Sequence, residues 1–374
     1  MQRRIGTVIR AYEEQGLHRT GTAIDRTSAD WLANEVRQIG LHPVLEEFSL
    51  SRVDPVEASI TVNGRKIEGL PLFDGGFTSP DGITGSLGGL NSDASIGLAE
   101  VAPNAAGGEA RRQNRHQAIA VITSGARPGF CPSNADSFLR PFGPPVLQVA
   151  SEAAPFLAEC VQRGSEAVLT AHVERTPAQA FNVVTVISGT NKSLAPLVVM
   201  TPRSGWWWCA SERGGGLACW LEIMRALRDT KPARDILFVA SSGHELGHLG
   251  IDSFIERRPG LVPAAKAWIH LGANIGAAQG PGNNLQASDD EMESMMADAM
   301  NNAGLRIDRR QPRGVVPRGE AENVHRGGGR YASIIGSNDL FHNTSDRGAD
   351  VIDLKVIERF ANAFATVATS LANA

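Results

Sequence analysis

Several features that would narrow the class of this protein are scarce in its 374 residues. The cysteines are few and lie without metal-type CxxC spacing, so we expect buried thiols; they are Cys131, Cys160, Cys209 and Cys219. No stretch approaches the roughly 20 apolar residues that a transmembrane helix needs, so we expect no membrane span. The net charge of −4 gives no reason to expect nucleic acid or an anionic membrane as a partner.

The composition is that of an ordinary soluble protein, with 42% apolar and 20% charged residues. The basic N-terminal residues have no apolar run behind them, so they do not form a secretory signal, and we expect a cytoplasmic location. The length allows one large core and a smaller appended unit. Whether the chain forms a homo-oligomer is left open by the sequence.

In the first half of the chain, a predicted helix is followed by segments with strand signals. Residues 28–40 have apolar positions at helical spacing, with Ser28 or Asp30 as a cap, and predict an amphipathic helix. The Asn-Gly pair at 63–64 predicts a hairpin turn. Residues 56–179 are rich in strand signals, including a buried strand at 116–125, and we interpret them as a β-rich insert.

From residue 180 onward, apolar strands alternate with amphipathic helices. Strands are predicted at 195–202, 234–243 and 265–276, and helices at 214–230, 290–304 and the C-terminus. This alternation is typical of an α/β fold with a mostly parallel sheet and helices on both faces. We assign residues 1–55 and 180–374 to this discontinuous domain.

The segment GHELGHLG at 243–250 contains the letters of a zinc protease helix, in which two histidines four residues apart bind one ion. Here a buried strand ends just before the motif, and Gly247 and Gly250 interrupt any helix. We therefore place His244 and Glu245 on a strand-to-helix loop, where open α/β sheets bind their ligands.

The chain resembles the zinc aminopeptidase family in the succession of five segments: VVMTP, ASERGGGLACW, SSGHELGHLG, AWIHLGANIG and DLFHNTSD. That family includes bacterial leucyl aminopeptidase, glutaminyl cyclases, glutamate carboxypeptidase and the transferrin receptor. The opening residues are also similar to the start of that family, and residues 56–179 are similar to a protease-associated domain. The resemblance implies a zinc-exopeptidase fold over nearly the whole chain.

The family's metal motifs are only partly kept. Pro202 occupies the position of the family's first zinc-binding histidine, and Ser204 occupies the position of the aspartate that supports that histidine. Ser211 stands at the bridging aspartate, with Glu212 beside it, and Gly272 or Ala273 at a later aspartate. Proline, glycine and alanine offer no side-chain donor to a metal, so one of the family's two sites is lost.

The other site is partly retained, and the resemblance implies at most one zinc ion. Its ligands would be Glu245, His342 and Glu212, with His248 as a substitute ligand, since three protein ligands and a water suffice for catalytic zinc. His244 replaces the family's catalytic glutamate and would accept a proton from the water. The alternatives are that Glu245 and His342 form a plain hydrogen-bonded pair and that Glu212 pairs with Arg213.

We expect the substrate, a small molecule or short peptide, to be bound by residues that follow the same strands. Trp206, Trp207 and Trp208 cannot all face one core, so at least one should line the cleft. Arg203 would point into the vacated metal space and hold a carboxylate, beside Ser204. Asn338 and Asp339 are further polar candidates, although loop capping explains both equally well.

Three functions are compatible with these residues. The first is a divergent hydrolase that cleaves an amide or peptide-type bond, with His244 and Glu245 as its catalytic residues. The second is a binding or scaffold protein that keeps the fold without the chemistry. The third is a metal-free hydrolase with Cys209, Ser204 or Ser211 as nucleophile.

Overall fold

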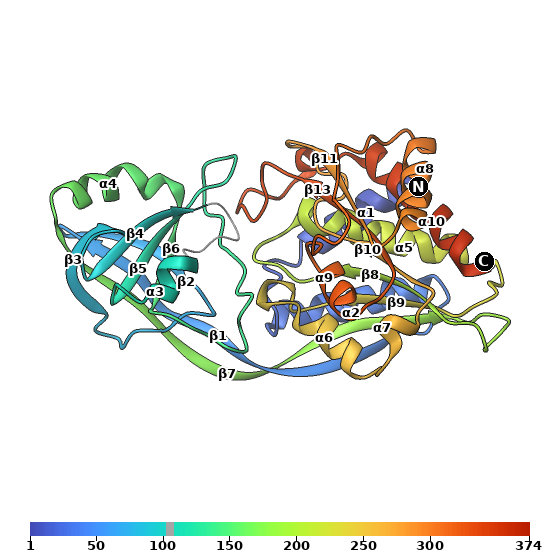
Figure 1. Ribbon diagram of the computed structural model, residues 1–374, viewed down its shortest axis with the longest axis horizontal. Helices are drawn as coiled ribbons and strands as arrows, with labels where there is room; N and C mark the ends of the chain where they lie inside the picture. The colour runs from blue at the N-terminus through green and yellow to red at the C-terminus, as the bar shows by residue number, and fades with distance from the viewer. Residues whose placement is uncertain (102–107) are drawn as a thin grey trace.

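The computed structural model describes residues 1–101 and 108–374, which form two lobes joined by two long strands (Figure 1). The strands are β1 Val44–Val62, β2 Arg65–Pro71, β3 Ile83–Gly89, β4 Ile96–Val101, β5 Ala118–Thr123, β6 Val146–Val149, β7 Glu166–Ile187, β8 Leu197–Pro202, β9 Ile236–Ser241, β10 Ala267–Leu271, β11 Gly282–Ala287, β12 Arg309–Arg310 and β13 Tyr331–Ser337. The α-helices are α1 Gln2–Glu13, α2 Ala23–Gln38, α3 Gly108–Gln113, α4 Ala154–Gln162, α5 Gly215–Leu227, α6 Leu249–Glu256, α7 Leu261–Ala264, α8 Asp290–Asn302, α9 Ala321–Arg326 and α10 Leu354–Asn373.

The larger lobe contains a mixed sheet with a parallel centre. Strand β8 lies between β9 and β10 and is parallel to both, and β13 continues the parallel set beside β10. On one side β7 is antiparallel to β9, and on the other β11 is antiparallel to β13. The predicted α/β fold with a large, mostly parallel sheet is therefore present.

Helices cover both faces of this sheet. Alternate strand residues point to opposite faces, and the two faces have separate cores: Val199 and Ile269 face one, Val198 and Trp268 the other. Helices α1, α2, α5, α8 and α10 contribute to the first core, and α6, α7 and α9 to the second.

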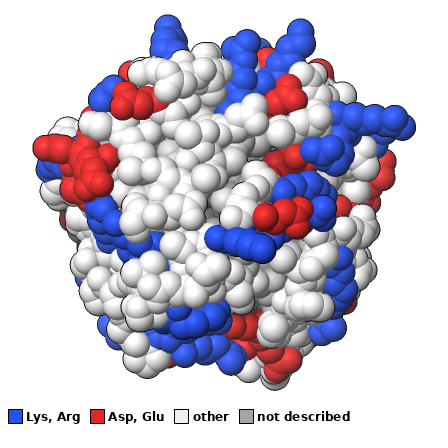
Figure 2. Space-filling view, turned by 90° about the vertical axis from the view of Figure 1, so that its right-hand side faces the viewer, with Lys and Arg blue, Asp and Glu red and all other residues white. Residues whose placement is uncertain are grey.

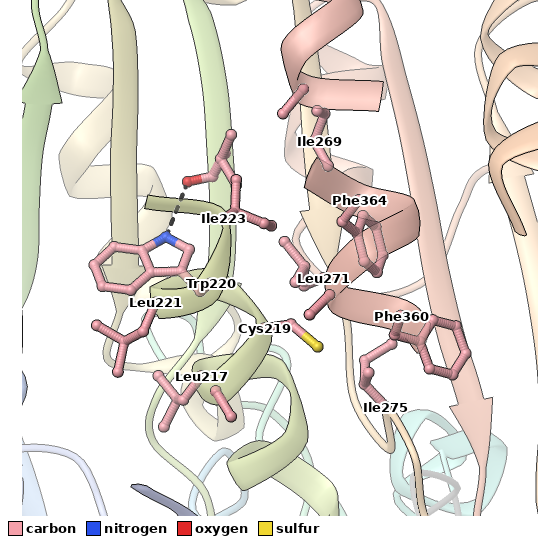
Figure 3. Close-up of a cluster of buried hydrophobic side chains, with 14 of the residues drawn as sticks. Leu217, Cys219, Trp220, Leu221, Ile223, Ile269, Leu271, Ile275, Phe360 and Phe364 are labelled. Atoms are coloured by element: carbon pink, nitrogen blue, oxygen red, sulfur yellow. Dashed lines mark hydrogen bonds between the residues drawn. The ribbon is translucent and has the colours of Figure 1, made fainter. Parts of the chain in front are cut away.

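Part of the first core lies between α5 and α10 (Figure 3). Trp220 of α5 lies edge-on to Phe238 at 5.9 Å between ring centroids, and its indole N–H donates to the carbonyl of Val199 at 3.2 Å. Phe360 and Phe364 of α10 pack in the same cluster. Full burial of such aromatic side chains fixes α5, and with it the segment just before α5 that belongs to the site.

The smaller lobe has its own sheet and core. Strands β2, β6, β5, β4 and β3 are joined in that order, and their apolar residues pack with α4. The long strands β1 and β7 pair with each other from Val44↔Val184 to Val62↔Ala167 and run through both lobes. The predicted boundaries near residues 55 and 180 thus fall inside these two strands, and a separable protease-associated domain at 56–179 stays a prediction; residues 102–107 of it lie outside the described residues.

Most predicted elements agree with the structure. The Asn-Gly turn joins β1 to β2, with both Asn63 and Gly64 in the left-handed region. The predicted helix at 28–40 begins earlier, at Ala23, because Thr22 caps it by accepting a hydrogen bond from the backbone N–H of Asp25. All four cysteines are buried free thiols, as predicted.

Two surface properties bear on partners. In the described part of the chain, every helix is too short or too polar to cross a bilayer. On the face shown in Figure 2, the end of the molecule to the right in Figure 1, side chains of both charges are interspersed around an uncharged centre.

Candidate functional site

A cleft of about 1270 Å³ lies beyond the carboxyl ends of the parallel strands in the larger lobe. Its walls include His244 after β9, Asn274 after β10 and Asn338 after β13. Asn134 and Asp136 extend to the same cleft from the smaller lobe. This is the edge at which open α/β sheets bind their ligands.

The GHELGHLG motif is a loop with a short 3-10 turn, as predicted, rather than a continuous α-helix. Residues His244–Leu246 form the turn, and the α-helix starts only at Leu249. Gly247 and His248 both have left-handed backbone angles, with φ of 75° and 67°. Gly250 fits here because a Cβ on it would lie 2.1 Å from the carbonyl oxygen of Ser242.

Glu320 joins two histidines at the wall of the cleft. Its Oε1 lies 2.9 Å from Nδ1 of His244, and its Oε2 lies 3.1 Å from Nε2 of His270. The other nitrogen of His270 pairs with the hydroxyl of Ser333 at 2.8 Å. His248 stands beside His244, with 5.1 Å between ring centroids.

The charges of this pair are set by burial and hydrogen bonding. Burial lowers the pKa of His244 to about 4, and the positive charge of Arg213 acts in the same direction. Burial alone would raise the pKa of Glu320, but His244 and the hydrogen bonds from both imidazoles bring that pKa well below its usual range. At neutral pH the site therefore holds a neutral imidazole beside a carboxylate.

Glu245, predicted as a metal ligand and catalytic residue, has both carboxylate oxygens engaged elsewhere. Oε1 accepts a hydrogen bond of 2.7 Å from the backbone N–H of Thr20, and Oε2 accepts one of 2.7 Å from the Ser204 hydroxyl. The side chain is buried and ties the N-terminal segment to the loops after β8 and β9. Ser204, predicted to bind substrate, is thus a partner of Glu245.

Glu212 and His342 do lie together, but Arg213 shares their space. Oε1 of Glu212 is 2.8 Å from Nη2 of Arg213 and 3.5 Å from Nε2 of His342, and all three side chains are buried. His342 donates from Nδ1 to the carbonyl of Pro132 at 2.7 Å, since a carbonyl only accepts. Its Nε2 has no hydrogen-bond partner among the described residues.

These residues do not fit the zinc ion that the resemblance implies. A divalent cation between Glu212 and His342 would stand next to the guanidinium of Arg213 in a fully buried position, where like charges repel strongly. The remaining predicted ligand, Glu245, is held by Thr20 and Ser204. Among the described residues, Glu245, Glu212 and His342 do not form a group of close ligand atoms. The sequence could not show that Arg213 turns toward Glu212.

Arg203 holds a carboxylate, but an internal one. It forms an ion pair of 2.8 Å with Asp25 and donates to the carbonyls of Asp25 and Phe181, with no exposed surface. The expected contact with a substrate carboxylate is therefore replaced by a contact in the core.

The three adjacent tryptophans are anchors between elements. Trp206 is buried and donates to Asn134, Trp207 donates to the carbonyl of His342, and Trp208 lies under Arg347. The described residues that line the cleft include none of the three. The expected aromatic wall is thus not formed by them, and Trp206 packs instead against Ala135 and Phe138 of the loop 124–145.

The remaining predicted residues divide between the cleft and its surroundings. Asn338 lines the cleft and donates to Ser211 and Asn274. Asp339 is not among the described lining residues and lies 3.5 Å from Arg127 in an ion pair near the surface.

The candidate nucleophiles Cys209, Ser204 and Ser211 are buried. Burial raises the pKa of the Cys209 thiol well above its usual value, so the thiolate that would attack a substrate is disfavoured. Ser211 donates to Asp346, and Ser204 donates to Glu245. None of the three is among the described residues that line the cleft.

Sequence reasoning missed Glu320 and the part played by the smaller lobe. Glu320 lies in the Gly-rich segment 314–333, which contains none of the motifs considered above, yet it is buried and central to the site. Loop 124–145 adds the carbonyl of Pro132 to His342, and its Ala135 donates to the carbonyl of Glu245 at 2.8 Å. No local pattern announces these contacts, because each joins distant parts of the chain.

A scan of protein-family models and a search of curated proteins found no match to this chain. Solved structures are similar at low sequence identity. The zinc aminopeptidase from Bacillus subtilis has a TM-score of 0.81 at 16% identity, over 100% of this chain and 95% of its own. The M28 peptidase precursor from Shewanella amazonensis has a TM-score of 0.77 at 15% identity, over 99% and 93%. The aminopeptidase from an Aneurinibacillus species has a TM-score of 0.75 at 14% identity, over 100% and 94%. This chain therefore has the fold of the zinc aminopeptidases and M28 peptidases.

Proposed function

We propose that this protein is a hydrolase that cleaves an amide or peptide-type bond in a small molecule or short peptide. The observation that carries the proposal is the buried pair of His244 and Glu320 in the wall of a large cleft, at the carboxyl edge of the parallel sheet. Fold alone does not define an activity, so the proposal depends on this site.

The pair has the properties that water activation requires. Glu320 fixes the orientation of the His244 ring, and the neutral imidazole still has a lone pair to offer. Such an imidazole can take a proton from an attacking water or bind a metal ion, and either role brings the nucleophile to the cleft wall. Asn134 adds an amide group that can orient a peptide bond, whereas both N–H groups of Asn338 already donate to Ser211 and Asn274.

The cofactor requirement is at most one divalent ion. The guanidinium of Arg213 already neutralises Glu212, where the family resemblance would put a metal. The proposed catalytic role of Glu245 changes accordingly: it supports the loop that carries His244, through Ser204, whose hydroxyl also accepts the backbone N–H of His244 at 3.1 Å.

The test is a panel of aminoacyl amides, dipeptides and blocked peptides, assayed with the full chain and with His244→Ala. We expect the variant to lose at least about 10²-fold in kcat/KM, the scale of positioned acid–base or metal-bound water catalysis. His325→Ala is the matched control, since this histidine is outside the site, and it should keep full activity. No hydrolysis of any panel member by the folded wild type would remove the proposal and favour a binding or scaffold protein.

A further inference from the structure

The side chains of His244, His248 and Glu320 form a cluster of potential metal ligands in the cleft. One ligand atom from each lies within 4.8 Å of the others, and all three residues line the cleft. They come from two loops far apart in the sequence, so their proximity is a property of the fold. None of them stands at a position where the family resemblance predicts a metal ligand, except His248 as a substitute.

The hydrogen bonds around His248 fix which of its nitrogens carries the lone pair. Asp252 can only accept, so the amide nitrogen of Asn323 faces it, at 2.6 Å. The amide oxygen of Asn323 is then the atom 2.9 Å from Nδ1 of His248, and this Nδ1 must donate. Nε2 of His248 is left as an acceptor, the form in which imidazole binds a metal. The chain Asp252–Asn323–His248 is the type of outer support that orients a ligand histidine.

Glu320 has matching support on the other side of the cluster. Its Oε2 is held by His270, which is held in turn by Ser333. Its Oε1 lies 2.9 Å from Nδ1 of His244. Two ligands of one tetrahedral zinc ion, each at ~2.0–2.1 Å from it, lie roughly 3.3 Å apart, so this pair is near the required spacing, and the ion would take the place of the proton that Nδ1 of His244 shares with Glu320. His248 is half-buried in the cleft wall, and its ligand atom already lies within 4.8 Å of those of His244 and Glu320.

The chemistry of the donors selects the ion. Two imidazoles and one carboxylate suit zinc and other first-row transition metals, whereas magnesium and calcium prefer oxygen ligands alone. Two histidines, one glutamate and an open position toward the cleft are also the composition of a catalytic zinc site. In contrast to the Glu212–His342 pair, this cluster has no guanidinium in ion-pair contact among the described residues.

We propose that His244, His248 and Glu320 bind one divalent transition-metal ion, with zinc as the first candidate. The ion site is thus displaced from the Glu245–Glu212–His342 set toward the open cleft. Its catalytic use rests on the proposed function, in which the ion would lower the pKa of a bound water. Binding of the ion does not depend on the proposed function.

The test is metal binding by the full chain without substrate. The protein is stripped with a chelator and then titrated with Zn²⁺ by calorimetry and with Co²⁺ by visible absorption, which reports coordination directly. We expect one equivalent of each ion per chain. His248→Asn, which keeps a residue tolerant of the left-handed backbone, and Glu320→Gln should each weaken binding more than about 100-fold, beyond the 10- to 100-fold of an outer partner. Asn323→Leu should fall within that smaller range.

The matched control is His325→Asn, a half-buried histidine of α9 outside the cluster, which should bind as the wild type does. Circular dichroism confirms that each variant is folded. The inference is overturned if the folded wild type takes up no ion stoichiometrically, or if His248→Asn and Glu320→Gln bind with wild-type affinity. Metal binding without hydrolysis would support the metal site and contradict only the proposed function. Hydrolysis by a chain that binds no metal would contradict only the metal site.

Discussion

The imidazole of His244 lies 2.9 Å from the carboxylate of Glu320, although 76 residues separate them in the chain. His244 follows a strand of the parallel sheet, and Glu320 immediately precedes α9. The contact joins these two parts of the larger lobe at the cleft and gives the site its negative charge.

Glu320→Ala is expected to lower the free energy of unfolding by about 1–3 kcal/mol, because two buried imidazole N–H groups lose their acceptor. Urea denaturation measures this loss. Glu322→Ala is the matched control, since Glu322 pairs with Arg326 one helical turn away at the surface. Its effect should stay within about 0.5 kcal/mol. Equal effects of the two substitutions would contradict a structural role for Glu320.

Removal of the positive charge beside Glu212 should be costly. Arg213→Gln leaves a carboxylate buried without its counter-ion, and such losses amount to about 3–5 kcal/mol. Glu212→Gln in the same chain removes the second charge, so the double variant should recover a large part of the loss. A thermodynamic cycle from chemical denaturation measures the coupling. Additive effects of the two substitutions would show that these charges do not interact.

The pH dependence of stability should carry a signature of His18. Burial lowers the pKa of His18 to about 3, and nearby Arg203 adds to the shift, while the unfolded residue keeps a pKa of 6.5. Below pH 6.5 His18 binds a proton in the unfolded chain but stays neutral in the folded chain. This difference lowers the free energy of unfolding as the pH falls toward 3. The slope is about 1.4 kcal/mol per pH unit.

His18→Gln isolates that contribution, since the amide can still donate to the carbonyl of Tyr12. We expect the stability of the wild type relative to this variant to decrease steadily between pH 6.5 and 4 in urea titrations. A difference that does not change with pH would mean that His18 is protonated in the folded state.

Gly215→Ala tests the close approach at the start of α5. A Cβ there would lie 1.8 Å from the carbonyl oxygen of Ile275, so backbone must move, and we expect a loss of about 1–3 kcal/mol. Gly6→Ala in α1 is the contrast, because the nearest atom is the flexible end of Leu354 at 3.3 Å. The gain in helix propensity should offset that contact. A lower melting temperature for Gly6→Ala than for Gly215→Ala would contradict the close approach at Gly215.

The fold could be predicted from the sequence largely because its signals are local. Apolar runs such as 234–243 and helical spacings such as 214–230 depend on neighbours within a few residues. The loop conformation of GHELGHLG also followed from Gly247 and Gly250. Element starts were less accurate where a cap such as Thr22 lies outside the apolar pattern.

The site could be predicted only in part because side-chain direction depends on distant partners. His244 was placed at the cleft from its position after a strand, Asn338 was only one polar candidate among others, and both line it. Glu245 shares the same loop, yet it turns to Thr20, which is 225 residues away. Glu320 was missed for the same reason, since nothing in its neighbourhood indicates a histidine 76 residues distant.

The continuous ladder of β1 and β7 has a mechanical consequence. Because the same two strands belong to both sheets, with one irregularity between Pro55 and Glu57, the lobes are connected by a stiff ribbon rather than a flexible tether. A force applied to the smaller lobe is transmitted along the paired backbone of β1 and β7. Strand β7 lies beside β9, and His244 follows the end of β9. Excising residues 56–179 would sever that ribbon and also withdraw Asn134 and Asp136 from the cleft, so it should disturb the cleft even though the cut is made far from it.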